Sequence, residues 1–441
     1  MSTLADELNT VLDGSVAGRL LSDLGRRMYF PKGILSQSAE ADAKAKRFNA
    51  TIGMAYEGGE PMILDAVRES LPGLKAAEAV AYASTGGVAT LRQRWKAELA
   101  RKNPTLASAS YSLPVVVPGL TAAVSYIADL FVEPGDTVVM PDLHWPNYRL
   151  IVEERKSAAG LTFPVFAPRN DGKLGFNVSG LEARLREAGA RRGKAACVLN
   201  FPNNPTGYTP TSEEAAAIVA ALVRVAEEGT DLLVIADDAY FGLQYERGLL
   251  EESIFARLAS AHPNILAVKA DGPTKEDYVW GFRLGFVTFA GTALSEAQQN
   301  ALAQKLLGVI RSSVSSSSAP AQYIFLKALD SPGYEAQKAR YRAMLEDRYR
   351  RARDVLATPA LPAALLPLPF NSGYFMSFDC RGISAEALRL KLLEERGIGT
   401  ISMQDRYLRV AFSSVEAPHI EELYQEIFSA ARELSGAARG R

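Results

Sequence analysis

The chain has 441 residues, of which 48% are hydrophobic, and this is enough for one large cored domain and a second, smaller one. Its 49 basic and 50 acidic side chains leave a net charge of −1, which gives no reason to expect nucleic acid or an anionic membrane as a partner. The two cysteines, Cys197 and Cys380, lie far apart and the three histidines are scattered, so neither a disulfide framework nor a metal site is predicted.

The N-terminal stretch carries Asp6, Glu7 and Asp13 and has no continuous apolar run, which argues against a targeting leader. No later apolar run reaches the roughly 20 residues that a membrane-spanning helix needs. We therefore expect a cytoplasmic protein with no membrane partner.

From about Val115 onward, short apolar runs alternate with helical patterns, which is typical of a parallel sheet covered by helices on both faces. Two of the helices begin with capping boxes, Thr211 with Glu214 and Ser295 with Gln298. This part of the chain is predicted to form one large α/β domain. Strands are predicted within residues 114–118, 134–142, 195–202, 231–240, 264–272 and 281–290.

After about Ser331 the pattern changes to a long, charge-rich helix over 333–357, strand candidates over 373–379 and 406–414, and a closing helix. This pattern indicates a smaller α+β domain. The expected boundaries are an N-terminal arm with part of the small domain over 1–65, a large domain over 66–330 and a small C-terminal domain over 331–441.

Ligand sites in open parallel sheets form beyond the carboxyl ends of the strands, so the turns after the predicted strands are the places to search. Gly119 precedes a helix whose free N–H groups suit an anion such as phosphate, although a glycine there is also ordinary turn chemistry. In the turn after the third strand, the Asn204-Pro205-Thr206-Gly207 sequence holds the Asn204 amide in one orientation, as a hydrogen-bond donor requires.

The next two strands are followed by charged residues. Alternation turns one of Asp237 and Asp238 into the site and the other towards a helix cap or solvent, and a buried carboxylate there needs a cation such as a protonated ring nitrogen. Lys275 is a candidate amine nucleophile, and Arg283, eight residues later, offers a forked donor for phosphate. Lys269 is a rival amine without such an arginine, and a strand lysine that reaches solvent is the preferred interpretation for it.

Together these turns supply the groups that pyridoxal 5′-phosphate (PLP) needs. The NPTG sequence at 204–207, D-x-A-Y at 237–240 and Lys275 with Arg283 eight residues on resemble the fold type I, class I/II aminotransferases of the aspartate and aromatic kind. The resemblance runs from about Ile52 to the C-terminus. It implies the α/β PLP-dependent transferase fold type I, in which a large domain with a mostly parallel seven-stranded sheet is flanked by helices and joined by a smaller α+β domain.

The resemblance also implies roles for individual residues. Lys275 would hold PLP as a Schiff base and carry the proton between Cα and C4′, and Asp237 would pair with the pyridine nitrogen. Tyr240 and Asn204 would hydrogen-bond the phenolic oxygen. The other cofactor-binding candidates are Gly119, Leu120, Thr121, Arg283 and Ser315 around the phosphate, Trp145 on the ring face, Thr274 beside the lysine, and Tyr82, which would reach the neighbouring subunit's phosphate in a homodimer.

On the substrate side, Arg409 matches the arginine that binds the α-carboxylate, Asn204 is a further substrate-binding candidate, and Gly53 resembles the glycine that lines the substrate pocket. Arg311 falls where dicarboxylate-specific relatives carry an arginine that reads the distal carboxylate from the neighbouring subunit. An arginine that complements the dipole at a helix C-terminus is an equal alternative for Arg311.

The sequence departs from the family pattern in the expected phosphate site. Gly272 stands three residues before the lysine, where the family often has serine, so one phosphate hydrogen bond is missing or comes from the backbone. Leu120 stands where a small or hydroxyl residue is common. Asp271 has no assigned role beyond that of a turn former.

The resemblance implies an aminotransferase that moves an amino group between an α-amino acid and a 2-oxo acid, with 2-oxoglutarate as the expected common acceptor, by a ping-pong mechanism. Two alternatives stay open. One is a PLP-dependent β-lyase or decarboxylase of the same fold, since the active-site residue types of these enzymes hardly differ from those of aminotransferases. The other is a regulatory module that binds the cofactor without catalysis, against which the presence of Lys275, Asp237 and Arg283 argues.

Overall fold

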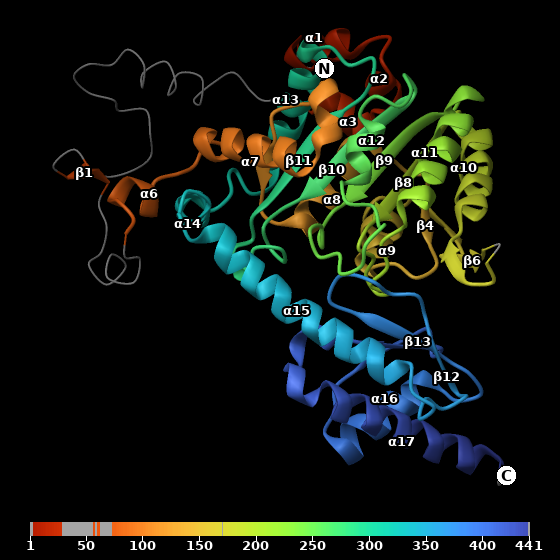
Figure 1. The fold of residues 1–441 in the computed structure, drawn as a ribbon. Helices are drawn as coiled ribbons and strands as arrows, with labels where there is room; N and C mark the ends of the chain where they lie inside the picture. The colour runs from red at the N-terminus through yellow and green to blue at the C-terminus, as the bar shows by residue number, and fades with distance from the viewer. Residues whose placement is uncertain (1–2, 29–55, 58–59, 62–72, 170, 440–441) are drawn as a thin grey trace.

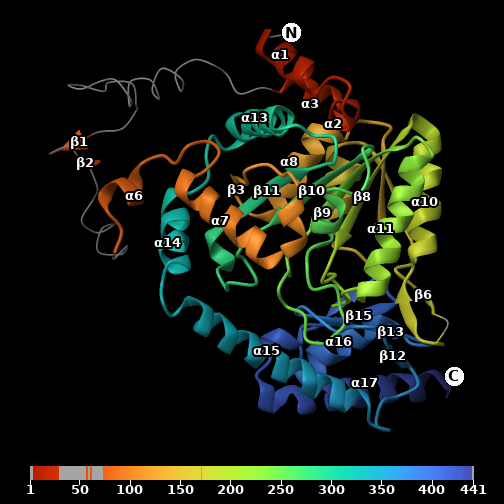
Figure 2. The ribbon, with the colours of Figure 1, turned by 45° about the horizontal axis from the view of Figure 1, so that its top comes forward.

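The computed structural model describes residues 3–28, 56–57, 60–61, 73–169 and 171–439. Its largest element is a seven-stranded sheet in the order β3-β11-β10-β9-β8-β4-β5 (Figure 2). In this sheet β11 runs antiparallel to its neighbours and the other pairs are parallel, which confirms the mostly parallel α/β sheet. The strands are β3 (Val115–Val117), β4 (Thr137–Pro141), β5 (Ala159–Phe163), β8 (Lys194–Asn200), β9 (Asp231–Asp237), β10 (Ile265–Asp271) and β11 (Gly285–Ala290).

Helices cover both faces of this sheet, because successive side chains of each buried strand point to opposite sides. In β9, Leu233 and Ile235 belong to one core, whereas Leu232 and Val234 belong to the core on the other face. The first face carries α1 (Thr3–Leu12), α2 (Val16–Leu20), α3 (Asp23–Arg27), α8 (Leu120–Phe131) and α13 (Glu296–Ser313), and the second carries α10 (Val178–Arg192), α11 (Ser212–Glu227) and α12 (Ile254–Leu258).

Both predicted capping boxes are present. The Thr211 hydroxyl accepts from the Glu214 N–H at 3.1 Å at the start of α11, and the Ser295 hydroxyl accepts from the Gln298 N–H at 3.3 Å at the start of α13. One strand prediction needs correction, and some strands of the structure have no counterpart among the predictions. The edge strand β5 was not assigned from the sequence, since its Ala-Gly-Leu-Thr-Phe run is only partly buried. The predicted strand over 281–290 begins only at Gly285, after a 3-10 turn over Trp280–Phe282.

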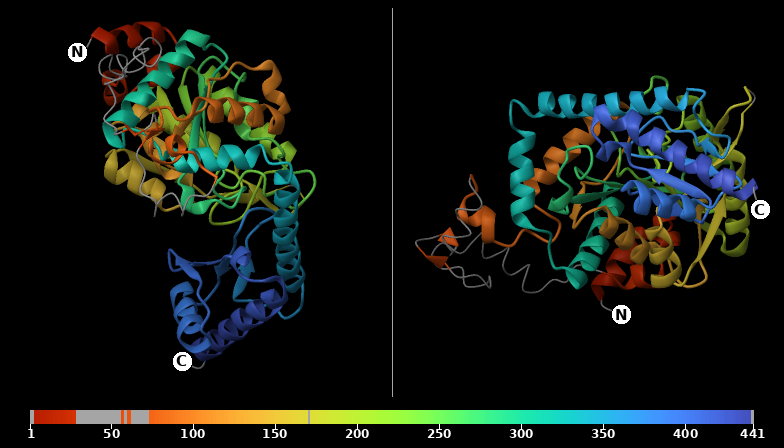
Figure 3. Two further views of the ribbon diagram at one scale, coloured as in Figure 1. Left: turned by 90° about the vertical axis from the view of Figure 1, so that its left-hand side faces the viewer. Right: turned by 90° about the horizontal axis from the view of Figure 1, so that it is seen from below.

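The C-terminal part forms its own sheet, in the order β12-β13-β15-β14, and its own core, in which Phe378, Leu408 and Tyr424 are buried. Helix α15 (Tyr334–Leu356) leads from α14 (Ala319–Leu329) to this smaller sheet, as Figure 1 and the left panel of Figure 3 show. The other elements are β12 (Leu365–Pro367), β13 (Met376–Cys380), β14 (Ile401–Met403), β15 (Tyr407–Val410), α16 (Ala385–Arg396) and α17 (Ile420–Arg439).

This arrangement confirms the larger α/β part and the smaller α+β part. The boundaries 1–65, 66–330 and 331–441 stay predictions, and the first of these ranges lies partly outside the described residues. Within the described part of the chain, no helix is both long and apolar enough to cross a membrane. The remaining elements are α6 (Ala76–Val80), α7 (Ala89–Lys102), α9 (Asn147–Arg149), β1 (Tyr56–Glu57), β2 (Glu60–Pro61), β6 (Phe166–Pro168) and β7 (Leu174–Phe176).

Candidate active site

The polar turns identified in the sequence meet at one end of the large sheet. They lie beyond the carboxyl ends of the central strands β8, β9 and β10 and beside the start of α8. They enclose a cavity of about 110 Å³. It is lined by Leu120, Thr121, Trp145, Tyr148, Asn200, Asn204, Asp237, Ala239, Tyr240, Thr274, Lys275 and Arg283. Residues from five separate turns are therefore brought to one site, as expected for a ligand site in an open α/β sheet.

Asp237 ends β9 with its side chain turned into this cavity, and it is 3% exposed. Its Oδ2 accepts from the Tyr148 hydroxyl at 2.5 Å, and its Oδ1 accepts from the backbone N–H of Ala239 at 3.1 Å. Burial raises the pKa of Asp237, and these hydrogen bonds and the charge of Lys275 offset only part of that effect. A cationic ligand group placed beside Asp237 would stabilise its ionised form.

Tyr148 was not identified from the sequence as a site residue. Its side chain is buried, and its ring packs edge-on against Trp145 with the ring centroids 5.5 Å apart. The two lie three residues apart, and the turn before α9 joins them, since the Tyr148 N–H donates to the Trp145 carbonyl at 3.0 Å. That spacing was the signal available in the "HWPNY" sequence. Trp145 forms one wall of the cavity, while Tyr148 holds Asp237 from behind.

Lys275 lies in the turn after β10, with its ammonium nitrogen 5.3 Å from the centre of the Tyr240 ring. Burial lowers the pKa of Lys275; the Asp237 carboxylate opposes this change and the Arg283 guanidinium reinforces it. A larger fraction of the amine is therefore neutral at a given pH than for a lysine in water, as a nucleophilic amine requires.

A candidate anion site lies at the start of α8. Gly119 caps this helix with φ of 91°, a conformation that favours glycine, and a Cβ at this position would come within 2.5 Å of Arg283 Nη2. The guanidinium therefore occupies the space above the helix N-terminus. Among the residues that the structure describes, no carboxylate pairs with Arg283, so its charge is available to a ligand anion such as phosphate.

The departure at Gly272 has a steric explanation. A Cβ at Gly272 would lie 2.7 Å from the Leu284 carbonyl oxygen, 3.0 Å from the Gly285 Cα and 3.2 Å from the Leu120 side chain. Two of these neighbours are backbone atoms, so a serine does not fit here without a shift of the chain. The small residue at 272 and the large one at 120 are thus complementary.

The turn over 203–207 orients the Asn204 side chain. The Asn204 N–H donates to Asn200 Oδ1 at 2.8 Å, and Asn204 Oδ1 accepts from Arg409 Nη1 at 3.0 Å. Because the oxygen is engaged, the amide NH2 of Asn204 is the group left to donate into the cavity.

Arg409 in β15 brings a half-buried positive charge next to this amide. Its guanidinium lies 4.3 Å from the centre of the Phe375 ring, and its Nε is buried with no hydrogen-bond partner among the described residues. Burial lowers the pKa of Arg409, and no carboxylate within the described part of the chain pairs with it. An anionic group of a substrate would provide the missing partner.

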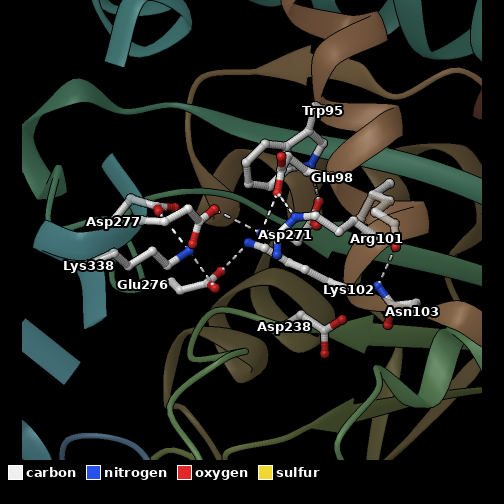
Figure 4. Close-up of polar contacts among 12 residues, drawn as sticks. Trp95, Glu98, Arg101, Lys102, Asn103, Asp238, Asp271, Glu276, Asp277 and Lys338 are labelled. Atoms are coloured by element: carbon white, nitrogen blue, oxygen red, sulfur yellow. Dashed lines mark hydrogen bonds and ion pairs between the residues drawn. The ribbon is translucent and has the colours of Figure 1, made fainter. Parts of the chain in front are cut away.

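The interpretation of Lys269 is wrong. Lys269 lies in strand β10, as expected, but it is 0% exposed and does not reach solvent. Its ammonium group pairs with Asp238 and, at 3.3 Å, with Asp271. Asp271 is likewise a buried strand residue rather than a turn former, and it accepts from Trp95 Nε1 at 3.3 Å (Figure 4). The alternation of Asp237 and Asp238 is confirmed, and Asp238 also accepts from the hydroxyl of Ser253, the cap of α12.

Several expected residues lie outside this cavity. Arg311 stands in the last turn of α13, where the helix-dipole alternative places it, and donates to Ser315. Neither of them lines the cavity. Tyr82 is 73% exposed. Gly53 lies outside the described residues.

The chain is similar to known aminotransferases along most of its length. The family described as aminotransferase class I and II matches residues 53–427. The aspartate/prephenate aminotransferase of Thermus thermophilus is 25% identical over 400 residues, which cover 89% of this chain and 95% of that protein. An uncharacterised HTH-type transcriptional regulator of Escherichia coli, YdcR, is 27% identical over 262 residues, 59% of this chain and 49% of that protein.

Solved structures show the same fold. A crystal structure of an aminotransferase from Anaerococcus prevotii superposes with a TM-score of 0.71 at 23% sequence identity, over 93% of this chain and 96% of that one. The match to the family extends from the segment before α6 into α17, so it includes every turn that lines the cavity. The chain is a transaminase that belongs to the aminotransferase class I and II family.

Proposed function

We propose that the protein is a PLP-dependent aminotransferase that moves an amino group between an α-amino acid and a 2-oxo acid by a ping-pong mechanism, with 2-oxoglutarate as the common acceptor. One observation carries the proposal: a partly buried lysine, Lys275, and a buried aspartate, Asp237, share a cavity next to Arg409, a half-buried arginine that pairs with no carboxylate of the described residues. This set provides an amine, a partner for a protonated ring and a partner for a carboxylate.

The residues present fit PLP. Arg283 and the N-terminus of α8 at Gly119 offer donors for its phosphate, and Thr121 and Thr274 line the same cavity. Asp237 is positioned to keep a ring nitrogen protonated, and the Asn204 amide and Tyr240 hydroxyl are the donors for the phenolic oxygen. When bound, PLP supplies the electron sink that makes the Cα–H bond of an amino acid breakable.

The chain's own residues would then do three things. Arg409 binds the α-carboxylate and so fixes the orientation of the substrate. The Lys275 amine would accept the proton from Cα and return it at C4′, a transfer for which its lowered pKa suits it. Tyr148 holds Asp237 in place by its hydrogen bond.

We also propose a cytoplasmic homodimer with shared active sites. Tyr82 supports this, because a large aromatic side chain that is 73% exposed suits a contact with a neighbouring subunit. Arg311 is the candidate reader of a distal carboxylate from that subunit, and its place outside the cavity of its own chain is compatible with this role.

Half-reactions followed by absorbance test the proposal, with a panel of amino acids added one at a time to the PLP-loaded protein. We expect conversion of bound PLP to its amino form and release of the 2-oxo acid, and then reversal by 2-oxoglutarate. Pyruvate with ammonia, or carbon dioxide, as the product would instead identify a β-lyase or a decarboxylase. Binding of PLP without any turnover would favour a regulatory module, for which the partial similarity to YdcR is the reason to test.

Two arginine variants separate the substrate contacts. Arg409→Ala is expected to abolish turnover of every amino acid in the panel, since the α-carboxylate loses its partner. Arg311→Ala is expected to affect only aspartate and glutamate. If aspartate and glutamate turnover is unchanged in Arg311→Ala, the distal-carboxylate role is wrong.

A further inference from the structure

The two residues that follow Lys275 are both acidic and both buried between helices. Glu276 lies 2.8 Å from Lys102 of α7 and 2.6 Å from Lys338 of α15, measured between Nζ and carboxylate oxygens (Figure 4). Lys338 also lies 2.9 Å from Asp277. The turn that carries Lys275 is thus bound by ion pairs to two helices at once.

These pairs are well shielded from water. The side chains of Lys338 and Glu276 are 14% and 12% exposed, and that of Asp277 is 1% exposed. Burial would lower the pKa of Lys338, but the charges of Glu276 and Asp277 outweigh it and raise that pKa. Removal of Lys338 would leave Glu276 and Asp277 with one cation fewer in this shielded position, which is a costly change.

Lys338 is well placed to connect distant parts of the molecule. It lies near the start of α15, which leads from the large sheet to the smaller sheet that carries Arg409 (Figure 1). Tyr334, one turn earlier on α15, donates to Asp277 as well. From the smaller sheet's side, the Tyr374 hydroxyl donates to the Lys275 backbone carbonyl at 2.9 Å.

We propose that Lys338 is a positioning residue for Lys275. By pairing with Glu276 and Asp277, Lys338 ties the turn after β10 to α15. This link fixes the Lys275 amine relative to the part of the chain that carries Arg409. The proposal rests on the proposed role of Lys275 as the amine that binds PLP. Without Lys338, the turn after β10 keeps its link to the sheet but loses its ionic link to α15. The hydrogen bonds from Tyr334 and Tyr374 remain, but the Lys275 amine is then fixed less precisely relative to Arg409, the proposed partner of the substrate carboxylate.

The test uses the PLP-loaded protein and three variants: Lys338→Met, Lys338→Arg and, as a matched control, Lys391→Met. Lys391 also pairs with two carboxylates, at 2.6 Å and 2.9 Å, and its side chain is 17% exposed, but it lies in α16, away from the cavity. Borohydride reduction and mass mapping of the peptides first establish whether PLP is attached to Lys275 in the unmodified protein. If it is not, the proposed function fails before the role of Lys338 is tested.

We expect Lys338→Met to keep the covalent link, but to react with the amino donor roughly 10- to 100-fold more slowly, the loss typical of a reacting group displaced by about 1 Å. The pH midpoint of the bound cofactor's visible absorbance also moves, because the charges of Asp237 and Arg283 act on the Lys275 amine and their distances to it change when the turn shifts. Lys338→Arg restores much of both properties, and Lys391→Met matches the unmodified protein.

A Lys338→Met protein with unchanged rate and midpoint, but with a lower melting temperature, would overturn the proposal and leave Lys338 a purely structural residue. If Lys338→Met does not fold, Tyr374→Phe removes only the hydrogen bond to the Lys275 carbonyl. A slower half-reaction with the covalent link intact in Tyr374→Phe, together with rescue in Lys338→Arg, supports the proposal. Unmodified rates in Tyr374→Phe would contradict it.

Discussion

Strand β10 holds a fully buried lysine, Lys269, and the turn after it holds a partly buried one, Lys275, in opposite surroundings. Lys269, within the strand, faces two carboxylates, Asp238 and Asp271, and although burial lowers its pKa, these charges raise it by more. Lys275, six residues later, has no carboxylate within ion-pair distance among the described residues, and burial lowers its pKa. Burial alone therefore does not make a lysine reactive; what decides is whether a carboxylate accompanies it.

The largest effect is expected when each amine is removed in turn. Lys275→Ala is expected to lose the covalent link to PLP and to slow the half-reaction by more than roughly 10⁴-fold, the upper range for a lost acid–base group. Lys269→Met is expected to keep the link in whatever fraction of the protein is folded. Intact mass after borohydride reduction measures both. A reduced adduct in Lys275→Ala that is absent in Lys269→Met would reverse the assignment.

The second largest effect is expected on stability. Lys269→Met leaves Asp238 and Asp271 buried without their cation, and we expect a loss of about 3–5 kcal/mol in the free energy of unfolding. Urea denaturation measures it. Lys327→Met, which breaks the exposed pair with Glu78 at 2.8 Å, serves as control and should change stability by less than about 1 kcal/mol. Equal losses in the two variants would mean that the cluster around Lys269 contributes no more than a surface pair.

Most residues of the cavity and two helix starts could be predicted from the sequence. Motif order and the rule that ligands bind beyond the carboxyl ends of parallel strands were enough to gather Asn204, Asp237, Lys275 and Arg283, which the structure places around one cavity. The capping boxes could also be predicted from the sequence, because a capping box depends on residues only three positions apart. Local signals of this kind need no knowledge of what packs against them.

What sequence reasoning missed depends on contacts between distant segments. The burial of Lys269 follows from its partner Asp238, which is 31 residues away, and that of Asp271 from Trp95, which is 176 residues away. Periodicity predicts the face of the sheet on which a strand residue lies, but not the charge of the side chains that pack against that face. Edge strand β5 was missed for a related reason, since its partial burial weakens the apolar pattern.

The third prediction concerns the turn between the two lysines. Gly272→Ala places a Cβ 2.7 Å from the Leu284 carbonyl oxygen, and we expect a loss of about 1–3 kcal/mol in stability with weaker retention of PLP. Thermal denaturation and equilibrium dialysis of the cofactor measure the two effects. Gly399→Ala, where an added Cβ meets nothing within 4 Å, is the control. A Gly272→Ala protein as stable as Gly399→Ala would show that the backbone at this turn yields easily.

The smallest expected effect is the pH-dependent change in stability when each lysine is removed. Its sign at neutral pH differs between Lys275 and Lys269. Since burial lowers the pKa of Lys275 below its ordinary value of 10.5, the unfolded chain binds a proton there more readily than the folded one, and the cost of holding a charged Lys275 disappears as the pH rises towards 10.5. Lys275→Met should thus make the cofactor-free protein slightly more stable at neutral pH, with no difference above about pH 10.5.

Lys269 behaves in the opposite way. Its folded pKa is raised, so its ion pairs stabilise the protein at every pH below 10.5, and this stabilisation is lost only as the pH rises through the higher folded value. Melting temperatures of Lys275→Met, Lys269→Met and the unmodified protein, each measured without cofactor from pH 7 to 11, separate the two cases. Destabilisation of similar size in both variants at pH 7 would mean that Lys275 is stabilised by a charge partner, and that its amine is no more reactive than that of Lys269.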